Sequence, residues 1–121
     1  MIVPRESVKP FDFDGLRIFD YTANRGLGSS LAVIEVPIGG VHAESWSKRS
    51  DKYYYVCEGA VRFVLDHEVH HLETGDFCFV RLGRHFSYAN EGTRAAKLVL
   101  VHSPSFRLED EEFAVPAVAE V

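Results

Sequence analysis

The stretch that decides the fold is GGVHAESWSKRSDKYYYVCEGAVRFVLDHEVHHLETGDFCFVRLGRHFSYAN, residues 39–90. It consists of short runs rich in Val, Leu, Tyr and Phe, separated by turn residues such as Glu58-Gly59 and Glu73-Thr74-Gly75-Asp76. No window of helical length keeps an apolar stripe with a 3.6-residue period. Evenly spaced short strands with Gly-centred turns predict an all-β protein, either a sandwich or a closed barrel. The predicted strands, including two outside this stretch, are 31–36, 53–57, 61–65, 77–80 and 97–101.

The flanking segments extend the same pattern at both ends. Two further edge strands are expected around Leu16 to Thr22 and Ser29 to Ile34. Beyond Pro104 an acidic arm, with the run Glu109 to Glu112, ends in small apolar residues that pack along the barrel or a partner, or stay loose. With 121 residues in total, we expect one domain over 1–121: a barrel core at about 31–106, N-terminal strands in 1–30 and the arm in 107–121.

Bulk composition excludes several classes of function. The net charge of -5 argues against nucleic acid or an anionic membrane surface as a partner. No apolar run reaches the roughly 18–20 residues that cross a bilayer, and the first residues lack a signal-peptide pattern. The only cysteines, Cys57 and Cys78, lie in apolar runs and are expected to be reduced thiols. The sequence therefore predicts a cytoplasmic protein.

Five residues at fixed spacing resemble the paired motifs of the cupin superfamily. Gly39 and Gly59 match the two glycines of the first motif, and Gly75, Gly83 and Asn90 match the second. The resemblance covers roughly 31–106 and implies a cupin-type double-stranded β-helix, or jelly-roll barrel, in a single domain. Such glycines mark sharp turns at strand ends, so they support the fold and leave the function open.

The same register removes the metal site for which the superfamily is known. Its three histidines and one glutamate fall on Ser45, Ser47, Phe86 and Lys52. Hydroxyls are poor ligands, an ammonium repels a cation and a phenyl ring has no lone pair, so we predict no metal and no cofactor. A rearranged site would need other residues, but strand alternation places His42 and Glu44 on the face opposite to Ser45 and Ser47. The residues considered for such a site are His42, Glu44, His70, His71, His85 and His102.

The resemblance also implies which side chains point into the barrel and form a ligand pocket. An inward Lys52 must be paired, hydrated or at the rim, because a lone buried ammonium is costly. Its partner could be Glu44 or Asp51, or an anionic or enolic ligand oxygen that Arg81 or Arg84 also contacts. The predicted ligand-binding residues are Ser45, Ser47, Lys52, Tyr54, Phe86, Tyr88 and Asn90.

Three classes of function stay open on the sequence alone. The first is a metal-independent barrel that binds a small anionic or polar organic ligand. The second is a metal-free isomerase, lyase or cyclase of sugar or secondary metabolism, in which Lys52 or Tyr54 acts as acid or base. The third is a scaffold or partner-binding protein without catalysis. The resemblance also implies a homodimer, because small cupins usually pair, and this chain has strand and tail material at both ends that could cover a partner's sheet edge.

Overall fold

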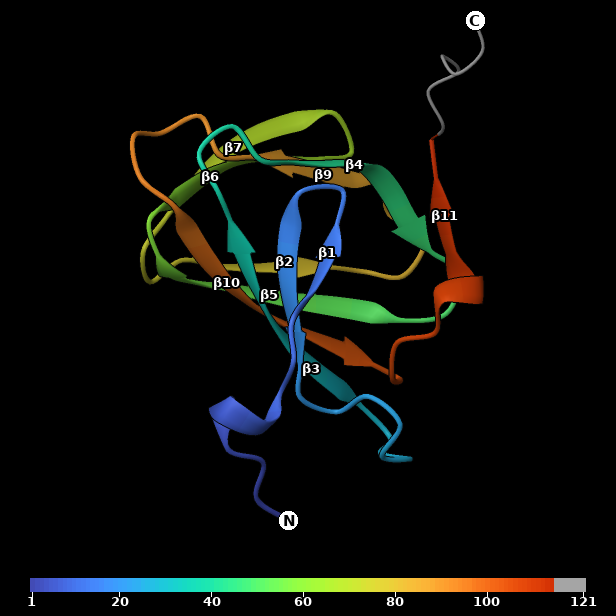
Figure 1. Ribbon diagram of the computed structural model, residues 1–121. Coiled ribbons are helices and arrows are strands. Elements are labelled where there is room, and N and C mark those ends of the chain that lie inside the picture. The colour runs from blue at the N-terminus through green and yellow to red at the C-terminus, as the bar shows by residue number, and fades with distance from the viewer. Residues whose placement is uncertain (115–121) are drawn as a thin grey trace, which may run out of the picture.

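The computed structural model describes residues 1–114, which are built almost entirely of short antiparallel strands (Figure 1). The all-β, single-domain architecture predicted from the sequence is therefore confirmed. The elements are η1 (Arg5–Ser7), β1 (Phe11–Phe13), β2 (Leu16–Asp20), β3 (Ser30–Val36), β4 (Val41–Ser47), β5 (Asp51–Glu58), β6 (Ala60–Leu65), β7 (Glu68–Glu73), β8 (Phe77–Val80), β9 (Phe86–Ala89), β10 (Ala96–Ser103), η2 (Leu108–Asp110) and β11 (Glu111–Phe113).

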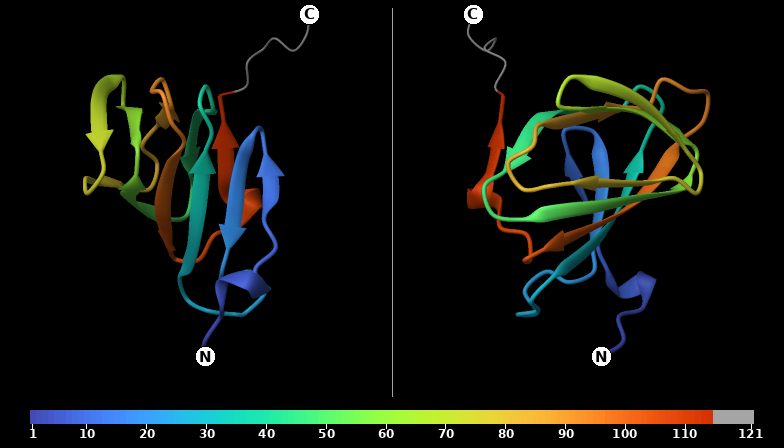
Figure 2. Two further views of the ribbon diagram at one scale, coloured as in Figure 1. Left: turned by 60° about the vertical axis from the view of Figure 1, so that its left-hand side comes forward. Right: turned by 180° about the vertical axis from the view of Figure 1, so that it is seen from behind.

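Two sheets face each other and enclose the core. The six-stranded sheet has the order β1-β2-β3-β10-β5-β8, and the five-stranded sheet has the order β11-β4-β9-β6-β7. Consecutive strands cross between the sheets, as β3 to β4 and β4 to β5 do, which is the jelly-roll arrangement (Figure 2). β1 and β11, the strands nearest the two ends of the chain, are each added at a sheet edge, where they cover strands that would otherwise be exposed.

Side-chain alternation along the central strands fills the space between the sheets. In β10, Ala96, Leu98, Leu100 and His102 are buried, whereas the residues between them are half-buried on the outer face. Aromatic rings from both sheets meet in the middle: Tyr54 of β5 lies edge-to-face with Phe63 of β6, with ring centroids 5.4 Å apart. Each large apolar side chain buried in this way contributes about 1.5–3 kcal/mol to folding.

Turn chemistry fixes the register of the hairpins. Asp14 and Gly15 both have positive φ (49° and 89°) between the paired residues Phe13 and Leu16, which is the backbone of a two-residue type I′ turn. Gly59, between β5 and β6, also has positive φ, and an added Cβ would lie 2.8 Å from the carbonyl oxygen of Ala95. This position therefore demands glycine both for its backbone angle and for the close approach of another strand.

Both terminal segments contribute to one open end of the barrel. The sequence predicted edge strands near β2 and β3, but both lie inside the six-stranded sheet, because the sequence analysis missed the edge strand β1, which forms a hairpin with β2. The described part of the acidic arm packs on the barrel: Glu111, Glu112 and Phe113 pair with Ser47, Trp46 and Ser45 of β4. The apolar end of the arm, 115–121, lies outside the described residues. The rings of Phe13 and Phe113 are 6.0 Å apart, so the hairpin and the arm meet (Figure 2). Among residues 1–114, no helix is long and apolar enough to cross a membrane.

Candidate functional site

A cavity of about 290 Å³ lies between the sheets, at the end closed by the β1–β2 hairpin and the C-terminal arm. Its walls are mainly apolar and include four phenylalanines, Phe11, Phe13, Phe106 and Phe113. At about 30 Å³ for each water in the liquid, it has room for a molecule about as large as ten waters. An apolar cavity with a few convergent polar groups is the usual form of a small-molecule site. The polar groups are Asp20, Ser30, His42, Lys52, Tyr54, His102 and Glu111.

Lys52 is the centre of the polar wall. Its ammonium donates hydrogen bonds to Glu111 Oε1 and to His102 Nε2, each at 2.7 Å, and lies 5.5 Å from the centroid of the Phe86 ring. Only 4% of the Lys52 side chain and 5% of the Glu111 side chain are exposed. Burial lowers the pKa of Lys52, and the charge and hydrogen bond of Glu111 counteract part of that effect. The partner is thus Glu111 of the arm, and not Glu44 or Asp51.

His102 is a neutral member of this group. Burial and, after it, the positive charge of Lys52 lower the pKa of His102 to about 3. The imidazole is therefore uncharged at neutral pH, and its Nε2 lone pair accepts the hydrogen bond from Lys52. One Lys52 proton is left over after the bonds to Glu111 and His102, and it is available to a ligand oxygen in the cavity.

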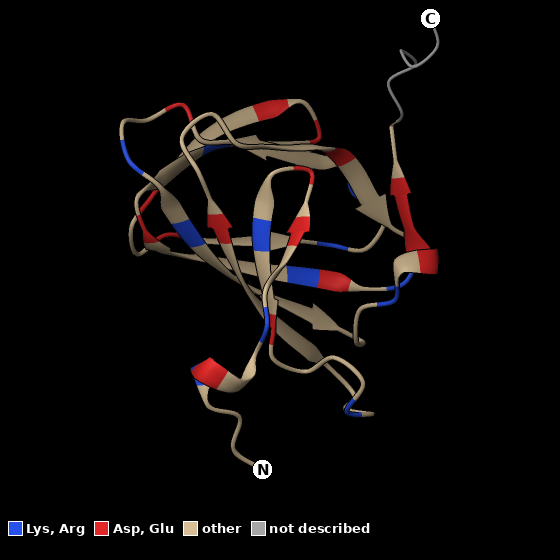
Figure 3. Cartoon of the chain, in the orientation of Figure 1, with Lys and Arg blue, Asp and Glu red and all other residues tan. Residues whose placement is uncertain are grey.

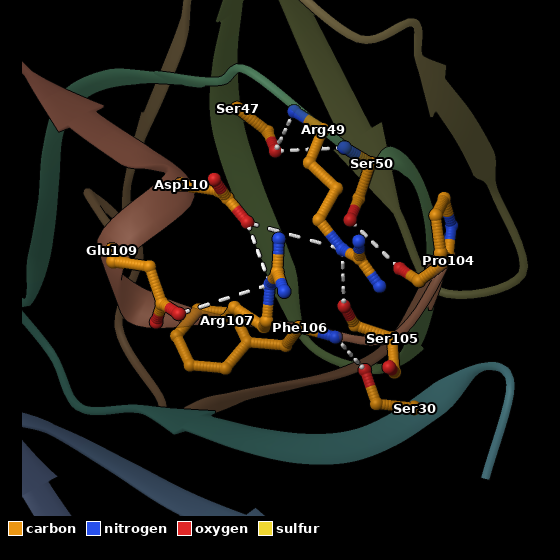
Figure 4. A network of polar contacts seen from close by, with 10 residues as sticks. All are labelled: Ser30, Ser47, Arg49, Ser50, Pro104, Ser105, Phe106, Arg107, Glu109 and Asp110. Atoms are coloured by element: carbon orange, nitrogen blue, oxygen red, sulfur yellow. Dashed lines mark hydrogen bonds and ion pairs between the residues drawn. The ribbon is translucent and has the colours of Figure 1, made fainter.

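A polar network holds the arm that carries Glu111 (Figure 4). Asp110 accepts a hydrogen bond from Arg107 at 2.8 Å and pairs with Arg49 at 3.9 Å, on the loop between β4 and β5. The Ser50 hydroxyl donates to the carbonyl oxygen of Pro104 at 2.7 Å. Ser30 Oγ accepts from the amide of Phe106. The arm is therefore tied to the loop between β4 and β5 and to the start of β3 before β11 begins.

His42 faces the cavity, and the prediction that it lies on the opposite face from Ser45 is wrong. The pairing of β4 with β9 shifts between His42 and Ser45, which shows a β-bulge at this point. The extra residue reverses the phase of β4, so that both His42 and Ser45 point inward. The His42 ring lies 5.0 Å from the Tyr88 ring and 5.1 Å from the Phe86 ring.

The hydrogen bonding of His42 defines what its imidazole can do. Nδ1 lies 2.7 Å from the carbonyl oxygen of Ala43, an acceptor only, so Nδ1 carries the proton and Nε2 carries the lone pair. Burial lowers the pKa of His42 to about 4; the hydrogen bond to the Ala43 carbonyl counteracts part of that effect, and the charge of Lys52 lowers the pKa by a smaller amount. At neutral pH His42 is thus an uncharged proton acceptor in the wall of the cavity.

Tyr54 and Tyr88 form the deeper part of the interior. Of the two, Tyr54 lines the cavity, and its ring lies 5.7 Å from that of Tyr88 in an edge-to-face arrangement. Burial raises the pKa of both phenols, so both are uncharged proton donors at neutral pH. The buried Tyr88 hydroxyl has no hydrogen-bond partner among residues 1–114.

Of the seven predicted ligand-binding residues, the structure brings Lys52 and Tyr54 to the cavity. Phe86 and Tyr88 are fully buried behind it, beside His42. Ser47 Oγ accepts hydrogen bonds from the amides of Arg49 and Ser50, and so holds a turn. Asn90 also has a structural role. Its side-chain amide donates hydrogen bonds to the carbonyl oxygens of Val36 and Arg94, and its Oδ1 accepts one from the amide of Gly92.

Ser45 and the two arginines also lie away from a ligand. Ser45 Oγ is buried without a hydrogen-bond partner in the described part of the chain. Arg81 is exposed and does not line the cavity, and Arg84 pairs with Asp66 on the surface. Sequence reasoning missed Asp20 and Glu111 as cavity residues. The only signal for Glu111 was the acidic run of the arm, and a charge run usually marks a solvated face.

Of the six residues considered for a rearranged metal site, His42 and His102 line the cavity and the other four lie elsewhere. His85 stacks on Trp46 with centroids 4.0 Å apart and bonds to Glu44 through Nδ1 at 2.8 Å, on the outer side of β4. His70 and His71 are exposed on β7. Residues 1–114 contain no group of three or more His, Cys, Asp or Glu side chains that could hold a metal ion. The superfamily metal does not fit its own positions either, because Lys52 places an ammonium there and Phe86 a phenyl ring.

The chain belongs to the cupin domain family, whose sequence model matches residues 32–102. No curated protein matched the sequence. Pac13 from Streptomyces, described as "a unique nucleoside dehydratase", superimposes with a TM-score of 0.82 at 22% identity, covering 94% of this chain and 90% of Pac13. A variant of the same protein has been solved with uridine. KdgF from Halomonas sp. gives a TM-score of 0.78 at 16% identity, covering 90% and 96%. These identities support the fold alone.

Proposed function

We propose that the chain is a metal-independent enzyme that binds a small polar organic molecule in the 290 Å³ cavity and removes water from it by acid–base chemistry. The observation that carries this proposal is the state of His42: Nδ1 is fixed by the Ala43 carbonyl, and Nε2 is an uncharged acceptor inside an apolar cavity that also holds an ammonium. A base and an acid in one water-poor site are what an elimination needs.

The step is written as loss of water from a molecule with a hydroxyl group β to a carbonyl. His42 Nε2 takes the proton from the carbon next to the carbonyl, the C–H electron pair becomes the new C=C bond, and the C–O bond breaks. The departing oxygen receives a proton from Lys52 and leaves as water. Lys52 suits the acid role better than Tyr54, because burial lowers its pKa but raises that of the phenol. Tyr54 would instead donate a hydrogen bond that orients the substrate.

The two proton transfers favour each other. The positive charge of Lys52 is one cause of the low pKa of His42, after burial. When Lys52 gives up its proton, that charge disappears and His42 becomes a stronger base. Solvent then returns the proton from His42 to Lys52. The likeness in fold to Pac13, a nucleoside dehydratase, supports dehydration over isomerisation or cyclisation. It also makes nucleosides the first compounds to test.

The test compares two histidine variants in a screen for turnover. Nucleosides, their oxidised derivatives and hydroxylated carbonyl compounds are incubated with metal-stripped protein, and mass spectrometry detects products lighter by one water. His42→Gln should lower the rate by about 10²–10⁴-fold, the usual contribution of a general base. His85→Gln is the matched control, because His85 lies on the outer side of β4 against Trp46 and should retain activity. Full activity of His42→Gln, or activity only after a metal is added, would contradict the proposal.

We further propose that a second copy of the chain covers the outer face of the six-stranded sheet. Tyr53 pairs with Phe79 and Tyr55 with Phe77 across β5 and β8, and these four rings are 38–59% exposed. At about 200 Å² for each ring they present an apolar patch of roughly 350 Å². That is a suitable centre for an interface of about 800 Å² per partner.

Light scattering on a size-exclusion column tests this dimer. Phe77→Lys should give a monomer, whereas Val69→Lys, at an equally exposed site on the other sheet, should stay dimeric. A monomeric wild type at micromolar concentration would refute the dimer. Free Cys57 and Cys78 suit a reducing compartment, so we place the dimer in the cytoplasm.

A further inference from the structure

The charges that face the cavity do not leave it positive. The charged members of its wall are one lysine, Lys52, and two carboxylates, Asp20 and Glu111. Its two histidines, His42 and His102, have pKa values of about 4 and 3 and carry no charge at neutral pH. Because Glu111 lies 2.7 Å from Lys52, it cancels that positive charge at close range. The wall therefore carries a net charge near -1.

Asp20 contributes the charge that is not cancelled. One of its oxygens, Oδ1, accepts hydrogen bonds from the amide and the hydroxyl of Thr22 at 2.9 and 3.1 Å. Its other oxygen, Oδ2, makes no hydrogen bond within residues 1–114, and no lysine, arginine or histidine lies within ion-pair distance of it there. Asp20 is thus an anionic acceptor at the cavity wall, able to receive a ligand hydroxyl.

Other cations of the open end are directed away from the cavity. Arg49 lies on the loop between β4 and β5, and Arg107 lies in the arm. Both pair with Asp110, and neither lines the cavity. The arm itself is acidic, as the red segments of η2 and β11 show (Figure 3). A phosphate or carboxylate entering here would meet no unpaired positive charge in the described wall, while a neutral hydroxylated molecule would find donors and acceptors.

We propose that the ligands of this cavity are uncharged hydroxylated molecules, such as nucleosides or free sugars, and that phosphorylated or carboxylated forms are rejected. This inference rests on the proposed function of the cavity. The sequence left open whether the ligand is anionic or polar, and the charges of the wall favour a polar, uncharged one. Lys52 and the phenol of Tyr54 would each donate a hydrogen bond to a ligand oxygen. His42 Nε2 and Asp20 Oδ2 would accept hydrogen bonds from ligand hydroxyl groups. Glu111 acts as the specificity-determining residue, since it removes the positive charge that would otherwise attract an anion.

Two pairs of probes isolate the effect of charge. Uridine and uridine 5′-monophosphate differ by a phosphate, and benzamide and benzoate are nearly equal in shape but differ in charge. Binding of each is followed at pH 7.5 by amide chemical shifts of Ala32, Leu100 and His102, which line the cavity. We expect the neutral member of each pair to bind at least about tenfold more tightly, a difference of about 1.4 kcal/mol.

Variants of the arm test the role of Glu111. Glu111→Gln removes the charge that neutralises Lys52, so each anion should bind about tenfold more tightly while its neutral partner changes little. Glu112→Gln is the matched control: Glu112 is the next residue, is 42% exposed and pairs with Lys48 outside the cavity, so the preference should not change.

The possible outcomes separate this inference from the proposed function. Anions that bind as tightly as their neutral partners would overturn the uncharged class while leaving the cavity as a ligand site. An unchanged preference in Glu111→Gln would overturn the role of Glu111 in setting that preference. Binding of none of the four probes at about 10 mM would overturn both the class and the site. Neutral probes that bind in preference to their anionic partners support the class. The elimination is tested separately by the turnover screen, because neither uridine nor benzamide has a hydroxyl group β to a carbonyl.

Discussion

The ion pair between Lys52 and Glu111 gives the sharpest test of the energetics. Lys52→Met removes the ammonium and leaves the Glu111 carboxylate inside the barrel, where Oε1 loses its partner and Oε2 already has none within residues 1–114. Breaking a buried pair in this way costs about 3–5 kcal/mol. Because β11 has only three residues and can detach to hydrate the carboxylate, we expect the lower value, about 3 kcal/mol.

Urea unfolding followed by the fluorescence of Trp46, the only tryptophan, measures this change. With a slope of roughly 1.5 kcal/mol per molar urea, the midpoint should fall by about 2 M. The double variant Lys52→Met/Glu111→Leu replaces both charges by apolar groups and should recover to within about 1 kcal/mol of wild type. Lys48→Met is the control, because it breaks an ion pair that is 54% and 42% exposed and should shift the urea midpoint far less than Lys52→Met does.

Two results would refute this reasoning. If Lys52→Met changed stability no more than Lys48→Met does, the pair would be hydrated and not buried. If the double variant were as unstable as the single one, the loss would come from the shape of the lysine side chain and not from the stranded carboxylate.

Three further predictions follow from the described contacts. In urea unfolding, Ser47→Ala should lower the free energy of unfolding by about 1 kcal/mol, because the Ser47 hydroxyl accepts hydrogen bonds from two amides. Ser45→Ala should be neutral or stabilising, because the Ser45 hydroxyl has no partner in the described chain. Equal effects of the two substitutions would contradict this prediction. Gly59→Ala should lower the free energy of unfolding by about 3 kcal/mol or more, because the added Cβ would lie 2.8 Å from backbone. Gly75→Ala should cost only about 1–2 kcal/mol in the same assay, because Gly75 has positive φ but open space around it. A smaller loss for Gly59→Ala than for Gly75→Ala would exclude a steric clash at Gly59. The pKa values of His42 and His102 in the folded protein lie below the unfolded value of about 6.5, so the unfolded chain binds more protons. The free energy of unfolding should therefore fall as the pH drops from 7 to 5, by up to about 2 kcal/mol for each histidine. If urea unfolding showed no such fall, the two histidines would be hydrated and not buried.

The barrel could be predicted from local signals. Turn residues such as Gly59 and Gly75 sit where the chain must reverse, and their positive φ (72° and 95°) explains why the pattern needs glycine. The inward direction of Lys52, Tyr54 and Phe86 was implied by the resemblance to the cupin motifs, and all three side chains are buried. The period of two preserves such a direction along a strand wherever the strand is regular.

The cavity could be predicted only in part, because two of its main features depend on long-range or irregular structure. The bulge between His42 and Ser45 reverses the phase of β4, and no local residue in Val41–Ser47 announces it. Glu111 reaches Lys52 because β11 pairs with β4, a contact between segments about sixty residues apart that a charge run cannot reveal. The sequence thus left open whether the acidic arm packs or stays loose, and it gave no sign that one of its carboxylates is buried.

The central claim is that this cavity binds a small polar molecule without a metal ion. The most direct measurement is a titration of chelator-treated protein, shown free of transition metals by elemental analysis, with uridine, followed by amide chemical shifts. The account predicts saturable shifts concentrated on β3, β10 and β11 around Ala32, Leu100 and Glu111, and their loss in a variant that fills the cavity, Ala32→Trp. Shifts that appear only after a metal is restored, or that persist in Ala32→Trp on the outer aromatic face, would contradict it.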